Sequence, residues 1–151
     1  MTFADEEEQK AVMAQIRDDS DELDWCVFGY EGKDKLKLVD KGTGGCDAMM
    51  GAVQDRQAMY GLFRMTEMVD KSLTVKFCYV VWQPEGVPIM LKGLLSTHKG
   101  VVTTAFRPFH VDFFAAERAD LTEEIAKHHL GGLSGTRSHV STKEETGFQA
   151  V

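Results

Sequence analysis

Hydrophobic and polar residues follow strand-like patterns in two neighbouring stretches near the N-terminal end of the chain. Residues 23–30, LDWCVFGY, are rich in aromatic and β-branched side chains, and residues 35–42, KLKLVDKG, alternate with a period of two. The intervening EGKD has the composition of a turn. The pattern therefore predicts a β-hairpin.

Helices are predicted on both sides of this hairpin. Residues 5–17 combine an apolar face with acids in the first turn and Arg17 in the last, an arrangement that suits the helix dipole. After the hairpin, the glycine-rich GTGG at residues 42–45 interrupts the chain. A short helix is predicted directly after it, over residues 46–54.

Two longer strands are predicted in the middle of the chain. They cover residues 58–68 and 73–82, with a short connection at residues 70–72. The second, LTVKFCYVVW, is almost continuously apolar, which is typical of a strand buried on both faces. The prolines and glycine of QPEGVP end it.

Residues 88–106, PIMLKGLLSTHKGVVTTAF, predict one long helix, which Pro88 suits at its first turn. Its expected buried face comprises Ile89, Leu91, Leu94, Leu95, Val102, Ala105 and Phe106. The spacing of the polar positions predicts one exposed stripe, formed by Lys92, Ser96, Lys99 and Thr103. Two glycines and several β-branched residues lower the helix propensity, so a pair of strands is an alternative for part of this segment.

The C-terminal part predicts a short strand over residues 109–114 and a helix over residues 120–130. Asp120 is the expected N-cap of that helix, and Glu123 completes a capping box. From Gly131 onwards, glycine, serine and threonine dominate, which is typical of a flexible tail over residues 131–151. The element order predicts an α+β domain over residues 1–130, with a mixed central β-sheet packed between α-helices.

Composition narrows the class of protein. The formal net charge of −7 argues against nucleic-acid binding. The three cysteines are widely spaced, and Cys26 and Cys78 lie in strand-like runs, so we expect buried free thiols and a reducing compartment. The first ten residues lack the features of a signal peptide, and no apolar run approaches the roughly 20 residues of a membrane span. We expect a cytoplasmic protein that does not insert into membranes.

The sequence contains no recognisable motif for catalysis or cofactor binding. The five histidines form no HxxxH pair and accompany no cysteine ligand set, so no metal site is predicted. GTGG completes neither a P-loop nor a dinucleotide-binding fingerprint, and there is no GxSxG motif. We expect neither enzymatic activity nor a cofactor.

Charge is unevenly distributed along this acidic chain. Residues 5–24 contain nine acids and two bases, whereas residues 86–111 contain three bases and no acid. Lysines on a surface helix commonly serve solubility alone. The 26-residue window without acids instead favours docking of an acidic partner, which the rest of the molecule would repel and this segment would attract.

Four segments together resemble the actin-depolymerising factor homology (ADF-H) family, and within it the coactosin-like branch. They are IRDDSDELDWCVFGYEG at residues 16–32, YGLFRM at 60–65, VKFCYVVWQPEGVP at 75–88 and LKGLLSTHKGVV at 91–102. They occur in family order and at family spacing over about residues 5–130. The resemblance implies the ADF-H fold, with a mixed sheet between helices.

The resemblance also implies actin binding. In the family, exposed basic residues of the long helix contact the cleft of actin, which here implies Lys92 and Lys99, with Ser96 and His98 nearby and apolar contacts from Val87 to Met90. A second, filament-specific surface corresponds to Lys76 of the KF motif, with Lys71 and Arg64 near it. Coactosins prefer actin filaments to actin monomers, so the resemblance implies a protein of the actin cytoskeleton that binds filaments and regulates their dynamics. We expect the protein itself to be a monomer.

Three alternatives stay open at this point. A cofilin-like or glia-maturation-factor-like protein of the same family would bind actin monomers, sever filaments or bind the branching complex. A phosphoinositide-binding module would use the same lysines on a membrane surface. A scaffold would instead bind through the acidic N-terminal face.

Overall fold

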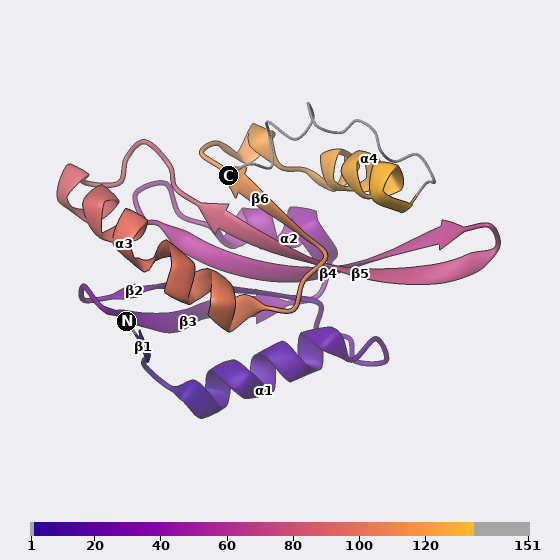
Figure 1. Ribbon diagram of the computed structural model, residues 1–151, viewed down its shortest axis with the longest axis horizontal. Helices are drawn as coiled ribbons and strands as arrows, with labels where there is room; N and C mark the ends of the chain where they lie inside the picture. Colours follow the sequence, from indigo (N-terminus) through magenta and orange to yellow (C-terminus); the bar gives the residue numbers. More distant parts are fainter. Residues whose placement is uncertain (1, 135–151) are drawn as a thin grey trace.

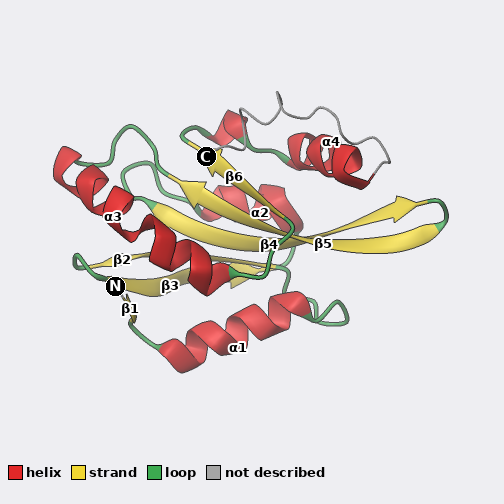
Figure 2. Ribbon diagram, in the orientation of Figure 1, coloured by secondary structure: helices red, strands yellow, loops and turns green. Residues whose placement is uncertain are grey.

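A computed structural model describes residues 2–134 of the chain, which fold around a six-stranded β-sheet (Figures 1 and 2). The strand order is β1-β3-β2-β4-β5-β6. The strands are β1 (Thr2–Phe3), β2 (Trp25–Glu31), β3 (Lys35–Gly42), β4 (Met59–Val69), β5 (Ser72–Trp82) and β6 (Val111–Ala115). The two end strands pair in parallel with their neighbours and the remaining pairs are antiparallel, so the predicted mixed sheet is confirmed.

Helices cover both faces of this sheet. The helices are α1 (Glu6–Arg17), α2 (Gly45–Ala52), α3 (Ile89–Phe106) and α4 (Glu123–Ser134), with a 3₁₀ turn at Arg118–Asp120. α1 and α3 pack on one face, and α2 and α4 pack on the other (Figure 1). This three-layer arrangement confirms the predicted α+β class, in which each helix buries one stripe against the sheet.

The core between the sheet and α3 is aromatic. Phe106, at the C-terminal end of α3, is fully buried and its ring lies 5.9 Å from that of Phe28 and 5.0 Å from that of Tyr79. Arg17 of α1 donates a hydrogen bond of 2.9 Å to the carbonyl of Phe106. The last turn of α3 is therefore fixed to the sheet and to α1, which gives the helix a rigid base.

The β4–β5 hairpin extends well beyond the other strands (Figure 1). Its outer end is largely exposed, and the cross-strand neighbours Met68 and Leu73 are each 65% exposed. The turn places Asp70 and Lys71 at φ values of 53° and 68°, in the left-handed region that non-glycine residues rarely occupy. The predicted central strand is thus buried in its second half and projects from the domain in its first half.

The predicted C-terminal helix differs from the structure at both ends. Asp120 belongs to the 3₁₀ turn, where its carboxylate accepts hydrogen bonds from the main-chain N–H groups of Ala116 and Glu117. The hydroxyl of Thr122 instead accepts the first-turn N–H of Ile125 at the start of α4. The helix continues to Ser134, four residues into the predicted tail, and residues 135–151 of that tail lie outside the described part of the chain.

Candidate functional site

The outward face of α3 carries only apolar or small residues along its whole length. Leu95, Val102 and Phe106 are buried against the sheet. The opposite side of the helix carries no charged residue and consists of Ile89, Met90, Gly93, Thr97, Gly100, Val101 and Thr104, all of them exposed. Ile89 and Met90, in the first turn, are 83% and 76% exposed. Exposed apolar side chains grouped on a rigid helix are typical of an interaction surface.

This orientation corrects the predicted buried face. Ile89 was expected to pack in the core together with Leu95. On a helix that turns about 100° per residue, Ile89 lies about 120° away from Leu95 and therefore points outwards. Val87, expected among the exposed apolar contacts, is only 3% exposed and belongs to the core.

The predicted polar stripe is present, but it lies on a flank of α3 rather than on its outward face. Ser96 and Lys99 are exposed, whereas Lys92 and Thr103 are half-buried. The hydroxyl of Thr103 donates a hydrogen bond of 3.2 Å to the hydroxyl of Tyr79 in β5, so Thr103 serves packing rather than docking. The lysines consequently border the apolar outward face on one side.

A small cavity of about 120 Å³ opens beside this flank, between α3 and the sheet. Its lining combines apolar and polar side chains, which are Tyr60, Val81, Gln83, Leu95, Ser96, Lys99 and Phe114. Asp112, on the adjacent strand β6, is half-buried, and burial raises the pKa of its carboxyl while Lys99, His129 and Arg107 act in the opposite direction. The acid-free window of the sequence thus has a carboxylate next to it in space.

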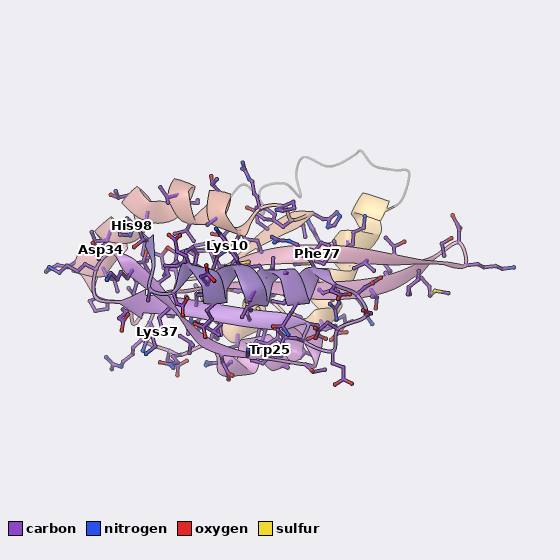
Figure 3. All side chains as sticks on the ribbon, turned by 90° about the horizontal axis from the view of Figure 1, so that it is seen from below. Lys10, Trp25, Asp34, Lys37, Phe77 and His98 are labelled. Atoms are coloured by element: carbon purple, nitrogen blue, oxygen red, sulfur yellow. The ribbon has the colours of Figure 1, made fainter. Side chains whose placement is uncertain are left out.

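His98 lies on the opposite flank of α3. Its Nδ1 atom is 3.2 Å from the hydroxyl of Tyr30, the two rings stack with centroids 5.9 Å apart, and Tyr30 is also 3.0 Å from the hydroxyl of Tyr60. Burial raises the pKa of both tyrosines, so both hydroxyls are protonated at neutral pH. His98, labelled in Figure 3, therefore links α3 to β2 and β4 and orients the helix.

The β4–β5 hairpin carries the other predicted lysines. Lys71 is exposed in the turn, and Lys76 is half-buried opposite Met65. Beside Lys76, His110 forms two hydrogen bonds of 2.8 Å with the main chain of Phe77. The main-chain N–H of His110 donates to the carbonyl of Phe77, and the ring Nδ1 of His110 accepts from the N–H of Phe77. The sequence did not predict that Met68 and Leu73 are exposed, because the pattern of a long apolar strand does not indicate where the strand leaves the core.

Arg64 has a structural role at the base of the hairpin. Its Nη1 atom donates to the carbonyls of Ile16 and Asp18 at 2.6 Å each, and Nη2 donates to the carbonyl of Asp21 at 2.5 Å. The guanidinium thus binds the end of α1 and the loop after it. Sequence spacing gave no indication of this contact, because 43 to 48 residues separate the partners.

Several classes of site are absent from residues 2–134. No group of three or more metal-ligating side chains comes together among them. None of their helices has the length and apolar character needed to cross a bilayer. All three cysteines are free and buried, as the sequence predicted for Cys26 and Cys78. The surfaces of α3 and the hairpin are therefore the candidate interaction surfaces among these residues.

Comparisons with known proteins agree with this geometry. The family model of cofilin/tropomyosin-type actin-binding proteins matches residues 2–131. Coactosin of Dictyostelium discoideum is 31% identical over 137 residues, which cover 87% of this chain and 94% of that protein. The crystal structure of coactosin from Entamoeba histolytica superposes with a TM-score of 0.78 at 25% identity, covering 87% of this chain and 94% of that one.

A second solved structure supports the fold. Mouse coactosin, an actin filament binding protein, superposes with a TM-score of 0.73 at 23% identity, covering 90% of this chain and 94% of that one. The family model spans nearly all of the described residues, and the Dictyostelium relative covers most of both chains. The chain therefore belongs to the cofilin/tropomyosin-type family of actin-binding proteins, in its coactosin-like branch.

Proposed function

We propose that this protein binds actin filaments in preference to monomers, through two surfaces, and so regulates filament dynamics. The helix surface comprises Ile89, Met90, Lys92, Ser96 and Lys99 of α3, and the hairpin surface comprises Met68, Lys71, Leu73 and Lys76 of β4 and β5. The observation that carries the proposal is the outward face of α3, where exposed apolar residues are bordered by lysines in an otherwise acidic molecule.

The helix surface combines two forces. Burying the side chains of Ile89 and Met90 against a partner contributes about 1.5–3 kcal/mol each before the costs of association. Lys92 and Lys99 add attraction to an acidic partner and orient its approach, because the rest of the molecule has the opposite charge. His98 and Arg64 support these surfaces from within the fold, His98 through Tyr30 and Arg64 through the end of α1.

The hairpin surface supports the preference for filaments. The first turn of α3 and the hairpin turn lie at opposite ends of the molecule (Figure 1). Two surfaces so far apart suit a partner that presents neighbouring subunits, as a filament does, better than a single monomer. The similarity to mouse coactosin, an actin filament binding protein, favours the same choice.

Co-sedimentation with filamentous actin tests the proposal. We expect the protein to pellet with filaments at low salt and less as salt rises, because the lysine contacts are screened. Lys76→Ala and Lys99→Ala should each weaken pelleting and leave the melting temperature nearly unchanged. Lys37→Ala, which removes the same charge from an exposed position on β3 outside both surfaces, is the matched control (Figure 3).

The outcomes separate the candidate functions. No pelleting of folded protein at low salt would refute filament binding. Tighter binding to monomeric actin than to filaments would indicate cofilin-like activity, and binding to phosphoinositide vesicles without actin binding would indicate a membrane module. Equal losses in Lys37→Ala and Lys99→Ala would show that the charge effect is not local to α3.

The family assignment supports three further expectations. The protein should act without catalysis or a cofactor, because the family functions by binding actin. It should be a cytoplasmic monomer associated with the actin cytoskeleton. Sedimentation velocity tests the monomeric state, and imaging of the tagged protein beside stained filaments tests the location.

A further inference from the structure

Sulfur atoms are distributed very unequally between the core and the surface. Of the seven methionines that the structure describes, Met68 and Met90 are 65% and 76% exposed. The other five are at most 5% exposed and pack in the two cores, namely Met13, Met49, Met50, Met59 and Met65. An oxidant in solution therefore reaches two thioethers of the described chain directly.

The cysteines offer no competing site. Cys26, Cys46 and Cys78 are all free, and each is 0% exposed. Burial raises the pKa of the Cys26 and Cys46 thiols to about 12 and also raises the pKa of the Cys78 thiol. Because the thiolate is the form that reacts with peroxide, all three are protected both sterically and chemically.

Each exposed methionine lies in an exposed apolar pair. Met90 follows Ile89 in the first turn of α3, and Met68 faces Leu73 across the hairpin on the same side of the sheet. One thioether thus belongs to each of the two surfaces defined above. Conversion of a thioether into a sulfoxide replaces an apolar group with a strongly polar one, so it opposes burial at an interface.

We propose that Met68 and Met90 are sites of reversible oxidation, at which hydrogen peroxide switches off docking through the hairpin surface and the helix surface. In the oxidation step the peroxide O–O bond breaks, one oxygen bonds to the methionine sulfur, and the other leaves as water. The sulfur is oxidised by two electrons and the peroxide is reduced. Reversal requires a methionine sulfoxide reductase, which removes the oxygen as water and oxidises two thiols to a disulfide.

Mass mapping tests the chemistry without any actin. The full chain is treated with increasing hydrogen peroxide, quenched and digested, and the sulfoxide content of each methionine peptide is measured. Met68 and Met90 should convert at low doses while the five core methionines stay reduced. Conversion of core methionines as readily as of Met68 and Met90, or sulfonic acid at a cysteine before either sulfoxide forms, would overturn the proposal.

The docking part of the inference rests on the proposed function and needs its own test. Oxidised protein, freed of peroxide before mixing, should bind filaments about fivefold or more weakly than untreated protein. The double variant Met68→Leu with Met90→Leu keeps the apolar surface but has no thioether there. Its affinity for filaments should be the same before and after peroxide treatment, although it retains Met1 and all core methionines.

The outcomes remain distinguishable. If peroxide weakened the filament binding of the wild type and of the double variant equally, a switch at these residues would be refuted. Undiminished binding by wild type that is fully oxidised at Met68 and Met90 would refute it as well. Recovery of binding after methionine sulfoxide reductase treatment would support reversibility, and sulfoxides that resist the reductase would refute it. If untreated protein fails to bind filaments, the proposed function fails, while the mapping still decides whether Met68 and Met90 are the oxidation sites.

Discussion

The Nδ1 atom of His110 accepts a hydrogen bond of 2.8 Å from the main-chain N–H of Phe77, and the two rings stack with centroids 5.5 Å apart. His110 thus continues the pairing of β5 and β6 by one residue, using its side chain in place of a strand carbonyl. An Nδ1 atom that accepts a hydrogen bond is unprotonated. The contact therefore depends on the neutral form of the imidazole.

This contact predicts a loss of stability in acid. Burial and the charge of Lys76 hold the pKa of His110 below its usual 6.5. In the unfolded chain the imidazole titrates near that usual value, so the unfolded state binds more protons as the pH falls below it. The stability contributed by His110 is present above pH 6.5 and is lost as the pH falls through the lower folded-state pKa. Urea unfolding between pH 5 and 8 measures the effect.

The variant His110→Asn isolates this contribution from that of the other histidines. The asparagine side-chain oxygen can accept the Phe77 N–H and does not titrate. We expect its unfolding free energy to depend less on pH than that of the wild type over the same range. Parallel pH profiles for the two proteins would contradict the assignment.

The proximity of Asp112 and Lys99 predicts an effect on affinity. The carboxylate of Asp112 partly offsets the charge that Lys99 presents to an acidic partner. Asp112→Asn should therefore strengthen filament binding about twofold at low salt, which corresponds to a few tenths of a kcal/mol. Glu7→Gln, on the exposed first turn of α1, changes the net charge equally and should leave affinity unchanged. Unchanged binding in Asp112→Asn, measured by co-sedimentation, would contradict the prediction.

The contacts of Arg64 predict a change in stability. Arg64→Ala removes donors from the carbonyls of Ile16, Asp18 and Asp21, and we expect the free energy of unfolding to fall by about 2–3 kcal/mol. Arg64→Lys should recover only part of this loss, because an ammonium group cannot span the same carbonyls. Denaturant unfolding measures both variants. Wild-type stability in Arg64→Ala, combined with weaker filament binding, would instead identify Arg64 as a contact residue.

The hairpin turn predicts opposite effects on stability and binding. Lys71 has a φ of 68°, which disfavours lysine relative to glycine, so Lys71→Gly should stabilise the fold by about 0.5–1 kcal/mol. The same change removes a charge from the hairpin surface and should weaken filament binding.

Asp70→Gly is the matched control for this turn. Asp70 has a φ of 53°, so glycine should again stabilise, although less because aspartate tolerates this region better. Binding should not weaken, since an acid is lost rather than a base. Weaker binding in both glycine variants would show that the shape of the turn matters, rather than the charge of Lys71.

Most of the secondary structure followed from local patterns in the sequence. The strand predicted over residues 35–42 is β3, the strand over 73–82 differs from β5 by one residue, and the helix over 88–106 differs from α3 by one residue. These elements carry a clear period of two, a long apolar run or a well-defined start. β1 was missed because two residues, Thr2 and Phe3, are too few to show any period.

The roles of individual residues depended on long-range packing. The spacing of Lys92, Ser96 and Lys99 placed them together on α3, since helical periodicity is a property of the chain alone. The side of α3 that meets the sheet was decided by the aromatic core around Phe106, which left Thr103 half-buried against Tyr79 and turned Ile89 outwards. Periodicity fixes which residues of a helix share a face, but only the tertiary structure determines what that face contacts.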